Sequence, residues 1–346
     1  MSEKIFGVDV GTGTLLAASK QTEGKMEISH MRNMFLMLDS KDIEASEMSA
    51  TNLDYVEIIG ENDETNFAIL GEDAFRFSNI FNREVRRAMA NGVLSNKDID
   101  AIDVITKMIE NLVGKGDNGT VCFSIPAQAF DIKMSEVSYH EKVFNTIFKS
   151  LGFTKIYSIN EGLAVIYSEC ASTNFSGLGI SFGSGMTNYC AAWNSLPVVT
   201  GAVGRGGDWI DICSGNAINM IPNKVTSMKE RKADLDGSRG LSLSKHDKRI
   251  VDSISFFYRD LIEYVIENLN DDFEKNRDNL NFDEPISIII SGGTSLIPGF
   301  LNCFTSIFNE INKFPFEISE IRHASEPLST VSKGCLLYAL NKASKQ

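Results

Sequence analysis

The chain carries IFGVDVGTGT at residues 5–14 and LGISFGSGMT at residues 178–187. In both stretches an apolar run predicts a buried strand, a glycine-and-hydroxyl turn follows it, and the next run predicts the return strand of a hairpin. Asp9 aligns with Ser181, which lies 172 residues later, or half a chain away. We interpret this repeat as the mark of a duplicated two-domain α/β fold.

Between and after the hairpins, apolar periodicity predicts strands that alternate with helices, as in sheets covered by helices. We expect strands at 121–125, 155–159 and 286–290, and helices beginning at Asp98, around 143–151, at 254–269 and after Pro298, which would occupy the first turn. Segment 39–64 is expected to be a loop-rich, solvent-facing insertion and segment 271–284 an acidic loop. Segment 224–249 is expected to be an outer subdomain with an exposed loop. The apolar run 31–38 (MRNMFLML) is expected to be a core strand of a small subdomain.

The composition excludes several classes of protein. The 346 residues carry a formal charge of −13, which argues against a broad basic face for nucleic acid or anionic lipid. No apolar run approaches the roughly 18 residues of a membrane span, and the start MSEKIFGVDV has no apolar signal core. The six cysteines are scattered, without a CxxC pair or metal-ligand spacing. We therefore expect a reduced, cytoplasmic chain without direct nucleic-acid contacts.

The two glycine turns predict a phosphate clamp. Glycine lets backbone N–H groups approach a phosphate closely, and Thr12, Thr14 and Ser184 can add hydroxyl donors. A tight hairpin would explain either turn alone, but the repeat and a third turn at Gly292–Gly293 favour the clamp. There is no GxxxxGK[ST] motif, so the clamp is not a P-loop. Asp9, at the end of the first strand, suits a magnesium ion held through water, and capping of the turn is the alternative.

With these motifs in order, the chain resembles the actin-like ATPases, whose ribonuclease-H-like fold is shared with heat-shock ATPases and sugar kinases. Residues 6–14 resemble the family's first phosphate motif, and residues 179–187 its second. Residues 289–299 (IISGGTSLIPG) resemble its adenosine motif. Residues 159–165 and 326–335 resemble its two connecting helices, the latter in the manner of the bacterial MreB and MamK branch. The resemblance runs from residue 5 to about 340.

The resemblance implies a cleft for Mg-ATP or Mg-ADP between two domains. Domain I would comprise residues 1–160 and 324–346, with an outer subdomain at about 20–70. Domain II would comprise residues 161–323, with an outer subdomain at about 205–262. Gly207 and Asp208 match the family's turn into that second subdomain, and Lys229 and Glu230 match its adenosine-flanking pair. The residues implied to contact the nucleotide are Gly11, Thr12, Gly13, Thr14, Gly183, Ser184, Gly185, Met186, Gly207, Asp208, Lys229, Glu230, Gly292, Gly293 and Thr294.

Three positions bear on hydrolysis. Glu161 falls where the family places the residue that orients the attacking water, and an acid that interacts with the helix dipole is the alternative. Asp9 would be the carboxylate that holds magnesium, through water. At Ser181 the family usually has an aspartate that supports the water network around the metal. Because Ser181 lacks that negative charge, we expect nucleotide binding to persist and ATP hydrolysis to be slow.

The resemblance favours a cytoskeletal ATPase whose protomers add head to tail into filaments, together with unnamed adaptor or cargo proteins. The alternative is a nucleotide-gated scaffold with little turnover and no filaments. Membrane contact is expected to be absent or indirect, because the first strand begins by Ile5 and leaves no room for an N-terminal amphipathic helix. Since the protomers are acidic, their assembly is expected to respond to salt and Mg²⁺ through screening of their repulsion.

Overall fold

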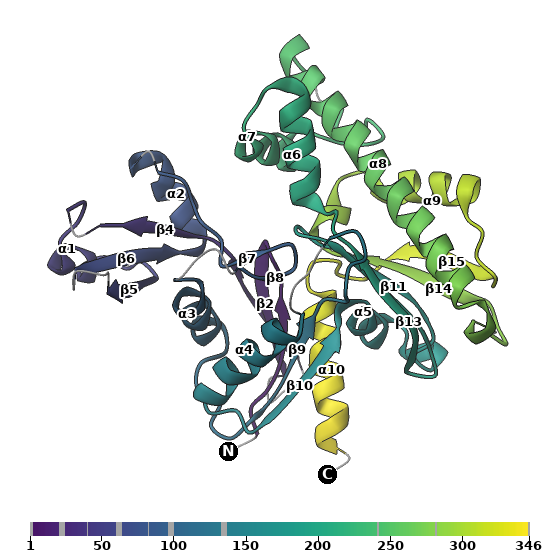
Figure 1. Ribbon diagram of the computed structural model, residues 1–346, viewed down its shortest axis with the longest axis horizontal. Coiled ribbons are helices and arrows are strands. Elements are labelled where there is room, and N and C mark those ends of the chain that lie inside the picture. The colour runs from purple at the N-terminus through teal and green to yellow at the C-terminus, as the bar shows by residue number, and fades with distance from the viewer. Residues whose placement is uncertain are drawn as a thin grey trace.

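The computed structural model describes residues 3–20, 25–39, 41–59, 64–81, 83–95, 100–132, 137–240, 242–280 and 282–344. The chain folds into two α/β domains, each built on a five-stranded mixed sheet (Figure 1). Within the described ranges, no helix combines the length and the apolar character needed to cross a membrane. The predicted fold class is therefore confirmed at the level of architecture.

The sheet of the first domain has β1 at its centre. β1 pairs antiparallel with β2, so that Asp9 lies opposite Leu16, whereas β1, β9 and β10 run parallel. The strands in spatial order are β10 (Lys155–Asn160), β9 (Thr120–Ile125), β1 (Ile5–Val10), β2 (Thr14–Lys20) and β3 (Met26–Arg32). The hairpin predicted at the start of the chain is confirmed.

The sheet of the second domain repeats this order. Its central strand β11 pairs antiparallel with β12 and parallel with β14, as β1 does with β2 and β9. In the same direction as for the first sheet, the strands in spatial order are β15 (Ile318–His323), β14 (Ile286–Ser291), β11 (Gly177–Phe182), β12 (Thr187–Trp193) and β13 (Leu196–Val203). Since β1 and β11 begin 172 residues apart, the duplication predicted from the sequence is confirmed.

A smaller three-stranded sheet stands beside the first one. Its order is β4 (Phe35–Leu38), β6 (Thr65–Leu70) and β5 (Tyr55–Ile59), with α1 (Ala45–Ser49) and α2 (Gly71–Phe81) against it. The prediction of an exposed loop over 39–64 was thus wrong for α1 and β5, and residues 40 and 60–63 lie outside the described ranges. The acidic residues around β5 hide the strand pattern in the sequence, but in the fold the backbone of β5 is hydrogen-bonded to β6.

The run 31–38 is divided between two sheets. β3 ends at Arg32 and β4 begins at Phe35, so the single predicted strand was wrong in its continuity. Phe35, Leu36 and Leu38 are completely buried, which confirms that this part of the run belongs to the core.

Two helices cover the first sheet, α3 (Ala101–Val113) and α4 (Val137–Ser150). Phe144 and Phe148 of α4 pack on Phe123 of β9, with ring centroids 6.1 and 5.3 Å away. The predicted start of the first of these helices, Asp98, lies outside the described residues. A short hairpin of β7 (Met89–Ala90) and β8 (Val93–Leu94) precedes α3.

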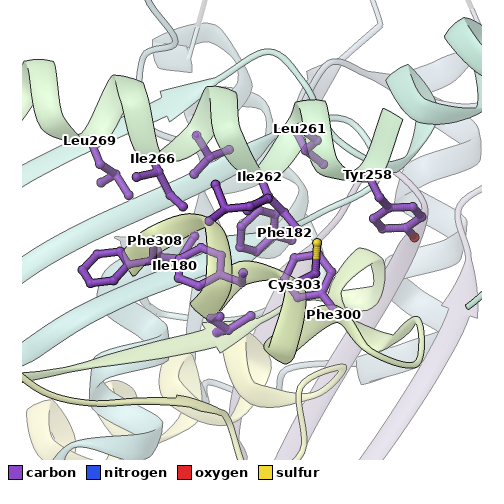
Figure 2. Packing of buried hydrophobic residues seen from close by; sticks show 14 of the residues in the cluster. Ile180, Phe182, Tyr258, Leu261, Ile262, Ile266, Leu269, Phe300, Cys303 and Phe308 are labelled. Atoms are coloured by element: carbon purple, nitrogen blue, oxygen red, sulfur yellow. The ribbon is translucent and has the colours of Figure 1, made fainter. Parts of the chain in front are cut away.

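The second domain carries a large apolar core (Figure 2). Leu261, Ile262 and Ile266 of one long helix face Phe182 of β11, which also makes an edge contact with Phe300 at 4.9 Å. The helices of this domain are α6 (Gly207–Ile218), α7 (Pro222–Arg231), α8 (Lys245–Lys275) and α9 (Phe300–Ile311). The single turns η1 (Ala171–Thr173), η2 (Arg277–Asn279) and η3 (Gly293–Leu296) complete it.

The predicted loop 271–284 is partly helical, and the outer segment 224–249, expected to carry an exposed loop, contains helix as well. Segment 224–249 contains most of α7 and the first turn of α8, and segment 271–284 contains the last turn of α8. The helix continues there because Phe273 is completely buried and Tyr189 donates its hydroxyl to Asp272. Pro298 does not enter α9, since Gly299 is the N-cap and the proline precedes it.

The domains meet along α5 (Glu161–Glu169) and α10 (Thr330–Ser344), which lie between the two sheets (Figure 1). A Cβ at Gly334 of α10 would lie 1.8 Å from the carbonyl oxygen of Ala164 in α5, and a Cβ at Gly7 of β1 would lie 2.0 Å from the Leu336 nitrogen. On the other side, a Cβ at Gly162 would lie 2.4 Å from the Cys190 nitrogen of β12. Glycine therefore allows backbone to rest directly on backbone through the whole junction.

A second crossing follows β9, where residues 126–132 reach the sheet of the second domain. The N–H of Ala127 donates to Asn188 Oδ1 at 2.8 Å, and Ala129 forms a parallel bridge with Ala202 of β13. Asp131 then accepts the N–H of Gly204 at 2.8 Å. The first domain is thus hydrogen-bonded to the edge strand of the second.

Gly334→Ala tests the junction of the helices. Helix propensity alone would make this change stabilising by about 1 kcal/mol. Because the new methyl group would collide with the backbone of Ala164, we expect instead a loss of about 1–3 kcal/mol in the free energy of unfolding, measured by urea denaturation. A gain in stability would show that α5 and α10 are not in contact at this point.

Candidate functional site

The first and second glycine turns lie against each other between the two sheets. Gly11–Gly13 follows β1, and Gly183–Gly185 follows β11. A Cβ at Gly13 would lie 2.2 Å from Ser184 Oγ, and a Cβ at Gly185 would lie 2.5 Å from Thr12 Oγ1. Any side chain at these positions would force the turns apart, so the contact itself requires glycine.

The third turn is hydrogen-bonded to the second. Thr294 Oγ1 donates to the carbonyl oxygen of Gly183 at 2.8 Å, and the N–H of Gly207 donates to the same oxygen at 3.0 Å. The N–H of Asp208 donates to the carbonyl oxygen of Ser184 at 2.8 Å. Residues that are distant in sequence are therefore joined into one backbone assembly around the second turn.

Two adjoining cavities are formed around the turns, one of about 70 Å³ and one of about 800 Å³. Every site residue predicted from the sequence lines at least one of them. The smaller cavity takes Asp9, Gly11, Thr12, Glu161, Gly183, Gly185, Met186 and Gly292. The larger takes Gly207, Asp208, Lys229, Glu230 and Thr294, while Gly13, Thr14, Ser184 and Gly293 line both.

The carboxyl groups of Asp9 and Glu161 both line the small cavity, where Glu161 is 9% exposed and Asp9 is half-buried. Burial raises the pKa of Asp9 to about 7, although a hydrogen bond from Ser124 Oγ at 3.0 Å opposes the rise. Burial, and next the charge of Asp9, raise the pKa of Glu161 to about 8. The hydroxyl of Ser181 and the neighbouring amide of Asn188 oppose that rise. A cation at this point would relieve both the desolvation and the repulsion.

The donor set of the small cavity suits magnesium. It consists of carboxyl and hydroxyl oxygens, which Mg²⁺ prefers, and a volume of about 70 Å³ leaves room for waters. Among the described residues no three His, Cys, Asp or Glu side chains form a metal-binding group. The residues therefore fit a magnesium ion that keeps its waters and faces Asp9, rather than a cage made by the protein.

The ammonium group of Lys229 is already paired within the second domain. Its Nζ lies 2.8 Å from the carboxylate of Asp211 and donates to the carbonyl oxygen of Gly207 at 2.9 Å. Asp211, only 2% exposed, also accepts the hydroxyl of Thr226 at 2.7 Å. Lys229 thus ties α7 to the first turn of α6 at the wall of the larger cavity. The sequence analysis did not include Asp211, which lies one helical turn after Asp208.

The sequence analysis also missed the β7–β8 hairpin. Asn91 and Gly92 have φ angles of 49° and 78°, as the two central residues of a type I′ turn require. The N–H of Gly92 donates to Thr12 Oγ1 at 3.0 Å, and a Cβ on Gly92 would lie 2.1 Å from Met186 Sδ. The hairpin therefore touches both the first and the second glycine turn. The Asn-Gly pair in the sequence was the signal that could have revealed the hairpin.

Two ion pairs join the domains across the larger cavity. Arg87, just before the hairpin, lies 2.6 Å from Asp208 of α6. Arg32, at the end of β3, lies 3.5 Å from Glu230 of α7 and 2.7 Å from Glu72. Two predicted site residues, Asp208 and Glu230, are thus engaged with arginines of the opposite domain.

Known structures share this arrangement of duplicated sheets, which is the actin-like fold. The structure of a MamK double helical filament is similar with a TM-score of 0.69 and 15% identity, over 100% of this chain and 99% of that chain. MreB5 of Spiroplasma citri bound to ADP is similar with a TM-score of 0.67 and 15% identity, over 99% and 98%. The ethanolamine utilization protein EutJ from Carboxydothermus hydrogenoformans has a TM-score of 0.55 and 14% identity, over 98% and 91%.

The family is given by a sequence model. The model described as Volactin matches residues 5–339, so the chain belongs to the Volactin family. No curated protein matches the chain by sequence. The resemblance to actin-like proteins stated from the motifs is confirmed.

Glu161→Gln tests the buried carboxyl pair through the pH dependence of stability. The ordinary pKa of a glutamate is 4.5, and Glu161 titrates near 8 in the fold, so the wild type loses stability as the pH rises between these values. Without nucleotide or Mg²⁺, we expect Glu161→Gln to have a higher Tm than wild type at pH 8, by about 2–4 °C, and a much smaller difference at pH 5.

Glu57→Gln, at an exposed position on β5, is the control for loss of one negative charge. Its Tm difference from the wild type should stay nearly constant with pH. The same constant difference for Glu161→Gln would contradict a buried Glu161 with a raised pKa.

Proposed function

We propose that the chain is an Mg-ATP-binding, actin-like protein that polymerises in a nucleotide-dependent way and hydrolyses ATP slowly. The observation that carries the proposal is the convergence of three glycine turns, from both halves of a duplicated fold, on the carboxyl groups of Asp9 and Glu161. Proteins with the same fold include a MamK double helical filament and MreB5 of Spiroplasma citri bound to ADP and to AMPPNP. We further propose that domain I comprises residues 1–160 and 324–346 and that domain II comprises residues 161–323, as expected from the sequence.

In this proposal the two cavities have different tasks. The larger one, of about 800 Å³, would hold the nucleoside between the domains, beside Lys229 and Glu230. The phosphates would reach the smaller one, where Gly11–Gly13 and Gly183–Gly185 supply backbone N–H donors. Because these turns touch, they must separate for the terminal phosphate to enter. The ion pairs of Arg87 and Arg32 would then hold the two domains together around the bound nucleotide.

The chain's own residues would act on water and charge. Magnesium, when bound, supplies charge neutralisation for the phosphates. Asp9 would hold its waters, and Glu161 would orient the attacking water from the start of α5. Ser181 occupies the place beside Glu161 with a neutral hydroxyl, which favours slow turnover. The same observation favours the second candidate, a nucleotide-gated scaffold without filaments.

Negative-stain microscopy and light scattering with and without Mg-ATP, together with phosphate release, test the proposal. We expect filaments with Mg-ATP and slow release of phosphate. ATP-bound monomers without phosphate release would overturn the proposed function and favour the scaffold.

Asp9→Asn tests the metal role. We expect Mg²⁺ to strengthen ATP binding to the wild type, and this enhancement to fall by about tenfold in the variant, which corresponds to about 1.4 kcal/mol in calorimetric titration. Binding in EDTA should be similar for both proteins. Asp103→Asn, on the exposed face of α3, is the matched control and should keep the enhancement. An undiminished effect of Mg²⁺ in Asp9→Asn would remove this residue from the metal site.

Ser181→Asp tests the cause of slow hydrolysis. The change restores a negative charge beside Glu161, so we expect single-turnover hydrolysis with Mg²⁺ to rise by about tenfold or more, or about 1.4 kcal/mol of transition-state stabilisation. Ser319→Asp, on exposed β15, controls for added charge. Equal rates for wild type and Ser181→Asp, at saturating ATP, would eliminate Ser181 as the explanation.

A further inference from the structure

Asn33 lies next to the first glycine turn but is not part of the site described above. It stands between β3, which ends at Arg32, and the small sheet of β4, β6 and β5, which begins at Phe35 (Figure 1). Its side chain is completely buried, and it lines neither of the two cavities. Any influence of Asn33 on a bound nucleotide would therefore pass through the turn.

Asn33 holds the first glycine turn at both of its ends. Its side-chain amide donates from Nδ2 to the carbonyl oxygen of Gly11 at 3.0 Å, and its backbone N–H donates to the carbonyl oxygen of Gly13 at 3.0 Å. Because a trans peptide unit is planar, its C=O and N–H groups point in opposite directions. The C=O of Gly11 shares a peptide unit with the N–H of Thr12, which lines the small cavity. Asn33 therefore directs that N–H away from itself.

The second glycine turn is supported in a comparable way. Gly183 follows β11 as Gly11 follows β1, and the two glycines are 183 − 11 = 172 residues apart, as the duplication requires. The carbonyl oxygen of Gly183 accepts the hydroxyl of Thr294, as that of Gly11 accepts the amide of Asn33. At both equivalent positions a side-chain donor thus holds the carbonyl group of the turn.

The second polar atom of the Asn33 side chain shows which part of the amide the fold uses. Oδ1 is buried, and no group in the described ranges donates to it. A buried acceptor without a donor destabilises a fold, so an apolar side chain of the same shape would serve packing better. The donor Nδ2 is therefore the part of the side chain that makes an interaction, and its partner is the glycine turn.

The backbone around Asn33 fixes the position of its amide. The chain enters the small sheet through residues 32–35 and leaves it through residues 86–92. The N–H of Phe35 donates to the carbonyl oxygen of Arg86 at 2.9 Å, and the N–H of Arg86 donates to that of Phe35 at 2.8 Å. Asn33 thus stands on paired backbone, which is the rigid support that a positioning group requires.

The segment that leaves the small sheet is bonded to the same turn. Gly92 donates its N–H to Thr12 Oγ1 at 3.0 Å, whereas Asn33 acts on the peptide unit that carries the N–H of Thr12. Both the backbone and the hydroxyl of Thr12 are therefore constrained by residues at the two connections of the small sheet.

We infer that Asn33 is a positioning residue of the first glycine turn, which keeps the N–H of Thr12 directed at the phosphates of a bound nucleotide. The inference rests on the proposed function, because it concerns the phosphate half of the proposed site. Asn33 is 22 residues from Gly11 in the sequence and touches no part of the larger cavity that would hold the nucleoside. Its loss should therefore weaken the binding of phosphates and spare that of the nucleoside.

Asn33→Ala and Asn33→Leu test the inference. The alanine variant removes Nδ2, and the leucine variant removes it while nearly keeping the size of the side chain, so that it should fold even if the alanine variant does not. We expect the Kd values of Mg-ATP and Mg-ADP, measured by calorimetric titration, to rise by about tenfold, and that of adenosine to change by less than about twofold. A general loss of packing would not discriminate between these ligands.

Asn270→Ala is the matched control. Asn270 is also a buried asparagine whose amide bonds to backbone, since it donates to the carbonyl oxygen of Ile311 at 3.0 Å and accepts the N–H of Lys313 at 2.7 Å. It lines neither cavity. We expect this variant to lose stability in urea denaturation and to keep the wild-type Kd values for ATP, ADP and adenosine.

Two results would overturn the inference. One is an unchanged Kd of Mg-ATP in the Asn33 variants, and the other is an equal loss of affinity for Mg-ATP and for adenosine. The wild type separates this inference from the proposed function. If the wild type does not bind Mg-ATP, the proposed function is wrong and the role of Asn33 falls with it. If the wild type binds Mg-ATP and the Asn33 variants bind it equally well, the proposed function stands and only the role of Asn33 is wrong.

Discussion

Gly334 of α10 rests on the backbone of Ala164 in α5, and the two helices rest in turn on the central strands of the two sheets. No side chain fills the space at these points, so the helices cannot shift by the small rearrangements that side chains allow in ordinary cores. The position of Glu161, at the first residue of α5, is fixed by this packing. The same packing holds the central strands β1 and β11, from which the two glycine turns extend.

The buried carboxyl pair shows how the local charge differs from that of the whole chain. The chain has a net charge of −13, yet burial raises the pKa of both Asp9 and Glu161, and the charge of Asp9 raises the pKa of Glu161 further. Of the arginines that line the larger cavity, Arg87 and Arg32 pair with acids of the opposite domain, and Arg239 donates to the carbonyl oxygens of Glu230 and Arg231. The site therefore offers backbone N–H groups and hydroxyls, with a place for a metal charge, rather than an excess of free cations.

The sequence revealed what repetition and apolar periodicity encode. The duplicated hairpins, the central strands and the location of every predicted site residue at the two cavities could be inferred, because each depends on short motifs. Strand β5 could not, since its backbone is satisfied by pairing with β6. Nor could the last turn of α8, which depends on the burial of Phe273 and on the hydroxyl that Tyr189 donates to the carboxylate of Asp272. The salt bridge of Lys229 with Asp211 and the contact of Gly92 with Thr12 depend on tertiary packing that local patterns do not contain.

Helix α8 has one further consequence. Between its two ends, Tyr258 lines the larger cavity and donates its hydroxyl to the carbonyl oxygen of Thr294 at 3.2 Å. Tyr258 therefore connects the wall of the cavity with a helix that extends from Lys245 to Lys275. If copies of the protein assemble as proposed, the free energy with which a ligand in the cavity changes the affinity between copies must equal the free energy with which neighbouring copies change the affinity for that ligand.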